Sequence, residues 1–162
     1  MIKLAVGADE KTPVAEAVLA ELQRRGHEVM VFGPLAGEKM LWPSVARRVA
    51  ETVARGEAQE GVLFCWTGTG VSLAANKVPG IRAALCADAE TARGARLWNN
   101  ANVLCLSLRH TAEAVGKEIL DAWFSNAYKP NPEDDEALRQ VEELERTYRS
   151  SEGAATVESP TQ

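Results

Sequence analysis

The sequence predicts an α/β fold in which helices cover both faces of a parallel sheet. Five short apolar segments, typical of strands buried on both faces, alternate with segments of helical periodicity. Such an alternation favours crossover connections, and therefore parallel strands, over hairpins. The length of 162 residues predicts one domain, and the sequence contains no internal repeat.

The elements follow one another from the N-terminus to residue 149. Thr12 and Pro13 are a favoured N-cap and first residue for the first helix, and Gly26 is typical of its C-terminal end. The expected strands are residues 2–7, 27–32, 61–66, 81–87 and 102–107. The expected helices are residues 13–25, 42–55, 71–75, 91–97, 111–124 and 136–149. Loops are expected at residues 33–41 and 126–135, and a polar turn at residues 98–101.

The last expected helix is highly charged but carries a narrow apolar stripe. Its apolar residues recur at helical spacing: Leu138, Val141, Leu144 and Tyr148. One side of this helix is therefore expected to pack against another surface. Residues 150–162 are polar and have no periodicity, which predicts a disordered tail after a domain of residues 1–149.

Composition excludes several classes of partner. The net charge of −5 disfavours nucleic acid and anionic membranes. No apolar run is long enough to span a bilayer, and the N-terminus lacks a signal-peptide pattern. Three cysteines without close pairs indicate reduced thiols and a cytoplasmic location. The two histidines form no metal-ligand cluster with them, so no metal is expected.

Residues 61–77 are the central motif, and they read as strand, glycine loop and helix. Cys65 ends the strand, where open α/β sheets bind their ligands. In residues 67–70, Thr-Gly-Thr-Gly, the glycines allow backbone N–H groups to approach an anion. The loop matches neither a P-loop nor the dinucleotide fingerprint. The alternative interpretation is that Cys65 is a core cysteine and the glycines only form a turn.

Four segments together resemble the ribose-5-phosphate isomerase B / galactose-6-phosphate isomerase family: residues 6–9, 65–77, 80–86 and 99–104. The resemblance extends over residues 1–149. It implies a Rossmann-like, three-layer α/β/α domain with a five-stranded parallel sheet. It also implies a homodimer with active sites at the interface and a C-terminal helix packing on the partner. Pairing of dimers into tetramers is left open.

The family interconverts aldose and ketose phosphates through an enediolate, without a metal or other cofactor. By position, Cys65 matches the base, and Thr67 matches the threonine that moves protons between sugar oxygens. Asp9 and Asn99 match residues that contact the sugar. The resemblance also assigns stabilisation of the enediolate oxygen to backbone N–H groups of Gly68, Thr69 and Gly70. Some relatives have a glutamate base where this chain has Val71, which favours Cys65.

The chain departs from the family at two usual histidines. Glu10 follows Asp9, where the family usually has a histidine. Trp98 precedes Asn99, where the family has the histidine that is the presumed acid/base for ring opening. An indole has no proton that titrates near neutrality. Ring opening is therefore expected to use Glu10 or water, unless the substrate is already open-chain.

The expected phosphate site is also altered. Arg109 matches one family arginine, but Glu136 and Gln140 stand where two more are expected. Arg139 is the adjacent candidate replacement. A glutamate near a phosphate dianion is repulsive, and bidentate recognition is lost.

Three tryptophans, Trp42, Trp66 and Trp98, are expected near the mouth of the site. Their indoles would suit the apolar face of an unphosphorylated sugar or another neutral polyol. The alternative is that they fill space left by lost side chains or plug a dead site. The leading hypothesis is an aldose–ketose isomerase of a small sugar or sugar derivative, phosphorylated or not, with specificity changed from ribose 5-phosphate. The rivals are a conventional ribose-5-phosphate isomerase, and a non-catalytic sugar-binding protein or one subunit of a two-chain isomerase.

Overall fold

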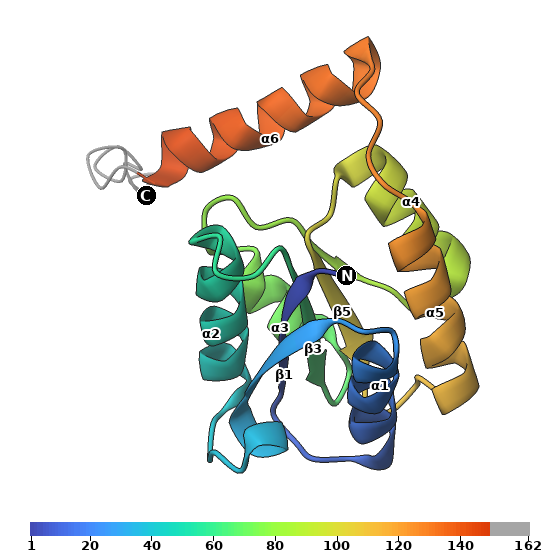
Figure 1. The fold of residues 1–162 in the computed structure, drawn as a ribbon. Coiled ribbons are helices and arrows are strands. Elements are labelled where there is room, and N and C mark those ends of the chain that lie inside the picture. Colours follow the sequence, from blue (N-terminus) through green and yellow to red (C-terminus); the bar gives the residue numbers. More distant parts are fainter. Residues whose placement is uncertain (150–162) are drawn as a thin grey trace, which may run out of the picture. The chain divides into compact units, whose positions relative to one another are not determined.

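Five parallel strands form the centre of the molecule, in the order β2–β1–β3–β5–β4 (Figure 1). The fold comes from a computed structural model, which describes residues 1–149. The strands are β1 (Lys3–Ala8), β2 (Glu28–Phe32), β3 (Glu60–Cys65), β4 (Ala83–Leu85) and β5 (Val103–Ser107).

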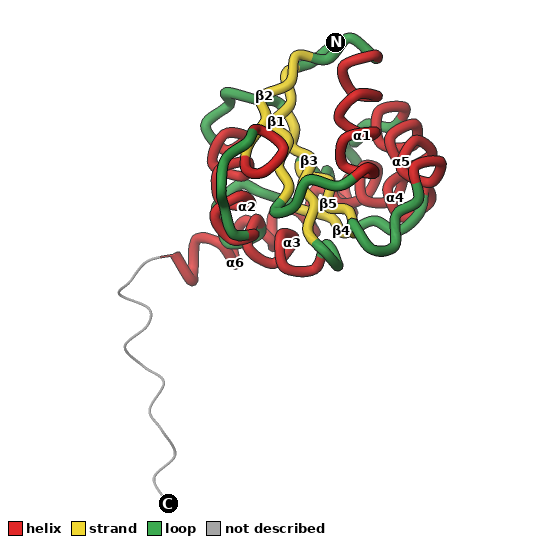
Figure 2. Tube along the Cα trace, turned by 90° about the horizontal axis from the view of Figure 1, so that it is seen from below, coloured by secondary structure: helices red, strands yellow, loops and turns green. Residues whose placement is uncertain are grey.

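Helices cover both faces of this sheet (Figure 2). Helices α2 and α3 lie on one face, and α1, α4 and α5 lie on the other. Their bounds are α1 (Pro13–Arg24), α2 (Trp42–Ala54), α3 (Thr69–Ala75), α4 (Ala89–Asn99) and α5 (Glu113–Ser125). The predicted Rossmann-like α/β class with a five-stranded parallel sheet is confirmed.

Alternation along β3 divides the core into two clusters. Val62 and Phe64 pack into the cluster that contains residues of α1, α4 and α5. Leu63 and Cys65 pack into the cluster that contains residues of α2 and α3. Because successive strand side chains point to opposite faces, this register directs the Cys65 side chain toward the α2–α3 layer.

The strand order reverses between β1 and β3. The chain leaves β1 toward β2 on one side and returns to β3 on the other side of β1. The two strands pair in parallel with Ala8 opposite Phe64, so both carboxyl ends lie at one point of the sheet edge. A reversal of this kind opens a crevice in which open α/β sheets bind ligands.

Several boundaries differ from the expected ones. The loop expected at residues 33–41 begins with a 3-10 helix, η1 (Gly33–Ala36), and Gly37 in the left-handed conformation ends it. Trp98 and Asn99 were expected in a turn but form the last two residues of α4, because Asn100, at φ 44°, ends the helix instead. The expected fourth strand of residues 81–87 shortens to β4; Asn102 accepts a hydrogen bond from the Arg82 N–H just before this strand, and Asn76 accepts one from the N–H of its first residue, Ala83.

The chain divides into two compact units, Met1–Tyr128 and a second that begins at Lys129. The second contains α6 (Pro132–Arg149), which starts four residues before the expected position because Asn131 accepts a hydrogen bond from the Asp134 N–H. Val141, Leu144 and Tyr148 of its stripe are exposed. Packing of α6 on a partner stays a prediction, and the tail prediction for residues 150–162 lies outside the described residues.

Candidate functional site

Cys65 is held at the carboxyl end of β3 between two loops. Cys65 is only 5% exposed, and it pairs in register with Ser107, the last residue of β5. The Cys65 carbonyl accepts hydrogen bonds from the N–H groups of Gly68, at 3.1 Å, and Leu108, at 3.0 Å. The Cys65 backbone is therefore held by the sheet, by the glycine loop and by the β5–α5 loop.

The glycine loop is a tight turn that leads directly into α3. Gly68, at φ 75°, is the N-cap of the helix, and a Cβ there would lie 2.5 Å from Leu85 Cδ1. Its N–H is already donated to Cys65, so it is not available to a ligand. Among the described residues, no acceptor is found for the N–H groups of Thr69 and Gly70. These two donors are the ones that the loop offers to an anion.

Two threonine hydroxyls of the loop form a pair. Thr67 Oγ1 and Thr69 Oγ1 are hydrogen bonded at 2.6 Å, and both residues are exposed. A hydroxyl can donate and accept at the same time, so this pair can pass a proton along while staying bonded.

Asp9 follows β1 and lies beside Cys65 at the point where the strand order reverses. Its N–H donates to the Phe64 carbonyl at 3.4 Å. Its Oδ1 is buried and has no hydrogen-bond partner among the described residues. Burial raises the pKa of the Asp9 carboxyl, and the charge of the adjacent, exposed Glu10 raises it further. A buried acceptor without a donor is a place where a ligand hydroxyl would fit.

The β5–α5 loop is fixed to the same edge by Ser107, which sequence reasoning missed. Its hydroxyl donates to the Trp66 carbonyl at 2.9 Å and accepts from the His110 N–H at 3.1 Å. The Arg109 N–H also donates to the Trp66 carbonyl, at 3.0 Å. A small hydroxyl residue at a strand end was the available sequence signal, but it is common in turns.

Arg109 places a positively charged side chain at this edge of the sheet. Its guanidinium lies 6.0 Å from the centre of the Trp66 ring, within the range of a cation–π contact. No carboxylate pairs with Arg109 within the described part of the chain. The exposed guanidinium is thus available to an anionic group.

Two tryptophans border the glycine loop. Trp66 is half-exposed directly before the loop. Trp42, the first residue of α2, places its ring against Gly70, where a Cβ would lie 3.0 Å from Trp42 Cε3. The Trp42 ring is therefore beside the glycine loop, and Trp66 directly precedes this loop; that the tryptophans line the mouth of a site stays a prediction.

Trp98 and Asn99 lie at the opposite edge of the sheet. They end α4 just before β5 begins at Val103, whereas Cys65 pairs with Ser107 at the other end of β5. At 3.3 Å per residue, the four steps of β5 separate the two edges by about 13 Å. Trp98 itself packs against Gly94 and lies 5.7 Å from the Arg93 guanidinium. One copy of the chain does not bring these residues to Cys65.

Arg139 belongs to α6 and is held there by two carboxylates. It donates to Glu136 at 2.7 and 2.8 Å and to Glu143 at 3.2 Å. Gln140 also donates to Glu136, at 2.8 Å. Hydrogen bonds from these side chains lower the pKa of Glu136 to about 2. The guanidinium that was expected to replace a phosphate-binding arginine is already engaged.

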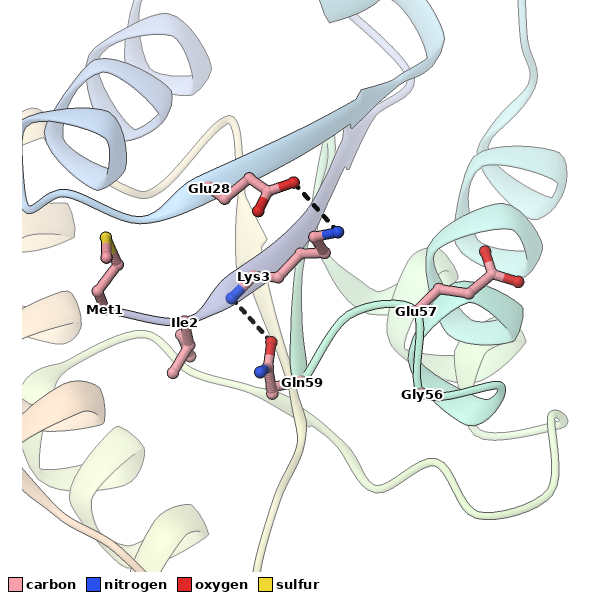
Figure 3. Close-up of a pocket in the computed structure, with 7 residues that line it drawn as sticks. All are labelled: Met1, Ile2, Lys3, Glu28, Gly56, Glu57 and Gln59. Atoms are coloured by element: carbon pink, nitrogen blue, oxygen red, sulfur yellow. Dashed lines mark hydrogen bonds and ion pairs between the residues drawn. The ribbon is translucent and has the colours of Figure 1, made fainter.

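A shallow cavity of about 400 Å³ lies at the amino ends of the strands and contains none of the expected site residues (Figure 3). Its Lys3 side chain pairs with Glu28 at 3.1 Å, and the Lys3 N–H donates to Gln59 at 2.7 Å. Within residues 1–149, no group of His, Cys, Asp or Glu is arranged to hold a metal, and no helix is long and apolar enough to cross a membrane.

Comparison with known proteins gives matches over most of the chain. The family model described as Ribose/Galactose Isomerase matches residues 4–143. Galactose-6-phosphate isomerase subunit LacB of Clostridium acetobutylicum is 38% identical, over 87% of this chain and 82% of that protein. D-erythrulose-4-phosphate isomerase of Pectobacterium atrosepticum is 37% identical, over 80% and 86%. The structure of Clostridium thermocellum ribose-5-phosphate isomerase B is similar with a TM-score of 0.84 and 34% identity, covering 90% of this chain and 99% of that one.

Substitution of Gly68 is expected to disrupt the glycine loop. Gly68→Ala places an L-residue at φ 75° and a Cβ against Leu85, whereas Gly56→Ala meets similar strain at φ 72° with no atom within 4 Å. Strain alone should lower the free energy of unfolding by about 1–2 kcal/mol in Gly56→Ala. Gly68→Ala should lose more, measured by urea denaturation of both variants. Equal losses would show that the loop tolerates the added Cβ.

Removing the partly buried charge of Asp9 should stabilise the protein at neutral pH. The folded-state pKa of Asp9 is raised, so the folded protein binds a proton more readily than the unfolded chain. Asp9→Asn should therefore increase the free energy of unfolding at pH 7. This gain should shrink as the pH falls through the raised pKa toward the unfolded value. Urea denaturation as a function of pH, with exposed Glu118→Gln as the control, measures it; a loss of stability at pH 7 would contradict the account.

Proposed function

We propose an aldose–ketose isomerisation through a cis-enediolate for this chain, which belongs to the ribose/galactose isomerase family. Family membership confirms the predicted enzyme class, an isomerase of the sugar-phosphate isomerase family. The observation that carries the proposal is the edge where Cys65, two N–H donors and the unpartnered Asp9 carboxylate oxygen meet.

Cys65 is the proposed base. Burial, with a smaller contribution from Asp88, raises the pKa of Cys86 to about 12, and burial also raises the pKa of Cys105. Those two thiols keep their protons near neutral pH, whereas Cys65 ends a strand at the ligand-binding edge. All three cysteines are free, which supports a reducing, cytoplasmic compartment.

Cys65 and the glycine loop carry out both proton transfers of the proposed reaction. The Cys65 thiolate takes the proton from C2 of an open-chain aldose, which leaves an enediolate, and returns it to C1. The N–H groups of Thr69 and Gly70 stabilise the developing oxyanion. The Thr67 hydroxyl, oriented by Thr69 at 2.6 Å, moves the second proton from O2 to O1. The product is the isomeric ketose, and no redox partner is needed.

Side chains around this centre bind the rest of the substrate. Asp9 accepts a sugar hydroxyl at its buried Oδ1, with exposed Glu10 as a second acceptor. The indoles of Trp42 and Trp66 face the apolar side of the sugar, because they border the donors. Arg109 is placed to bind an anionic group when the substrate has one.

A second copy of the chain completes the site. Trp98 and Asn99 are separated from Cys65 by the length of β5, so they serve the site of a neighbouring subunit in a homodimer. Whether dimers pair into tetramers is a separate question of assembly. Exposed apolar residues on the α2–α3 side, Leu41 and Leu73, support association of copies.

The substrate is proposed to differ from ribose 5-phosphate. Arg139 is held by Glu136 and Glu143, and neither Trp98 nor Asn99 titrates near neutral pH. A small sugar that is already open-chain needs no ring-opening acid or base, and a sugar without a phosphate needs no phosphate-binding arginine. D-erythrulose 4-phosphate, which the name of one relative gives as its substrate, has O4 esterified and forms no five-membered ring.

A second candidate is one subunit of a two-chain isomerase or a non-catalytic sugar-binding protein. It is favoured by the similarity to a protein named as a subunit of galactose-6-phosphate isomerase. In this case the chain holds Cys65 and the loop but obtains its remaining groups from a different partner.

Deuterium exchange from D₂O tests the proposal. The wild type should incorporate deuterium at C1 or C2 of at least one sugar in a panel of ribose 5-phosphate, erythrose 4-phosphate, galactose 6-phosphate, ribose and erythrose. Cys65→Ala should reduce the rate by about 10²–10⁴-fold, because the base is lost. Cys86→Ser, which replaces a buried thiol outside the proposed machinery, should keep the wild-type rate.

Either outcome is informative. Equal exchange in Cys65→Ala and wild type would exclude a cysteine base. No exchange by the wild type across the whole panel would favour the sugar-binding protein or the two-chain isomerase.

A further inference from the structure

A largely buried ion pair joins the start of β3 to α4. Glu60, the first residue of β3, and Arg96 of α4 approach to 2.7 Å, with side chains only 14% and 13% exposed. The Trp123 indole N–H, from fully buried Trp123 of α5, donates to the second Glu60 oxygen at 2.6 Å. The Arg96 guanidinium also lies 5.0 Å from the centre of the Trp123 ring. We call these three residues the Glu60 clamp.

Arg96 also binds the chain segments that follow its own helix, α4, and the neighbouring helix α5. Its Nη1 donates to the Ala101 carbonyl at 2.5 Å, just after α4 ends. Its Nε donates to the Asn126 carbonyl at 3.3 Å, just after α5 ends. One planar guanidinium therefore fixes the ends of two helices relative to the first residue of β3. A lysine ammonium cannot reproduce this fork of donors.

Stability alone gives a weak reason for such a pair. Removing two charges from water is unfavourable, and apolar residues of similar volume often stabilise a core equally well. The ion pair instead fixes the orientation of the groups that it joins, because each donor and acceptor has a defined position. The Glu60 clamp is therefore better understood by what it holds in place.

The Glu60 clamp holds the end of α4 that carries Trp98 and Asn99. Arg96 precedes them by two and three residues in the last turn of the helix. Arg82 Nε also donates to the Asn100 carbonyl, at 2.7 Å. Two guanidinium groups thus bind the carbonyls of the two residues that follow Asn99, and they hold the chain where α4 ends.

We propose that Arg96 is a positioning residue, which acts through Trp98 and Asn99 on the active site of the neighbouring subunit. This inference rests on the proposed function, in which those two residues complete the partner's site. Glu60 and Trp123 orient the Arg96 guanidinium. The effect of losing Arg96 should therefore appear in the neighbouring subunit rather than at Cys65 of the same chain.

Two variants test the inference in the full-length protein. Arg96→Lys keeps a charge for Glu60 but loses the additional carbonyl contacts. Glu60→Gln keeps an acceptor for Trp123 but loses the ion pair. The matched control is Arg47→Lys, because Arg47 is also a helical arginine with a carboxylate partner, Glu51, at 2.6 Å but is exposed. Both test variants should lower kcat/KM about tenfold, since small misplacements of contact residues reduce rates strongly.

An NMR measurement separates positioning from general loss of structure. The indole ¹H–¹⁵N resonance of Trp98, assigned with Trp98→Phe, should shift in Arg96→Lys, and those of Trp42 and Trp66 should not. The control Arg47→Lys should leave all of them unchanged. If the Trp98 resonance stays unchanged in both test variants, the positioning role is wrong.

Heterodimers purified with two different tags decide whether the effect is exerted in the neighbouring subunit. Each contains Cys65→Ala in one subunit, so that one site is active. Arg96→Lys should reduce activity about tenfold when it is in the Cys65→Ala subunit, which supplies Trp98 and Asn99 to the active site. It should have no effect when it is in the other subunit. Equal losses in both arrangements would contradict the proposal.

The two proposals fail in distinguishable ways. If no form of the protein catalyses exchange, the proposed function is wrong, and the Trp98 resonance alone decides whether Arg96 positions the end of α4. If the wild type is active and the resonance shifts but kcat/KM is unchanged, Arg96 orients α4 without any role in the reaction, and the inference is wrong.

Discussion

The parallel register of β3 with its two neighbours is the constraint on which the site depends. Pairing with β1 places Asp9 beside Cys65 where the strand order reverses. Pairing with β5 sets Ser107 opposite Cys65, and its hydroxyl fixes the carbonyl that follows the cysteine. The same register also places the end of α4 at the far end of β5. The strand register therefore brings Asp9, Cys65 and Ser107 together and separates them from Trp98 and Asn99, which we propose act in the neighbouring subunit.

The carboxyl edge combines a stable core with groups that are left unsatisfied. Cys65 is buried against the α2–α3 layer, yet the next residues leave two N–H groups without acceptors. Asp9 has a buried oxygen without a donor and a raised pKa. Unpaired polar groups lower stability unless a ligand pairs with them, which is typical of binding sites. Elsewhere in the described chain, charges such as those of Glu60 and Arg96 are paired.

Local sequence patterns were sufficient to predict much of the fold and the position of Cys65. Alternation of apolar strands and helices predicted the sheet, and the glycine loop after a strand predicted where Cys65 lies. Helix ends were less predictable: α4 continues through Trp98 and Asn99 because Asn100 adopts the left-handed conformation. The hydrogen bond from the Gly68 N–H to the Cys65 carbonyl depends on the geometry of the folded turn, so the sequence did not show that this N–H is unavailable to a ligand. The separation of Asn99 from Cys65 follows from strand pairing, which no local pattern contains.

Mixing two inactive variants tests the proposed shared site most directly. Cys65→Ala and Asn99→Ala are each expected to lose isomerase activity as homodimers. After unfolding and refolding together in equal amounts, half of the dimers should be mixed, and each mixed dimer should contain one intact site. The account predicts recovery of about one quarter of wild-type activity, the statistical value for two-fold symmetric dimers. No recovery, with mixed dimers demonstrated by mass spectrometry, would show that each chain builds its site alone.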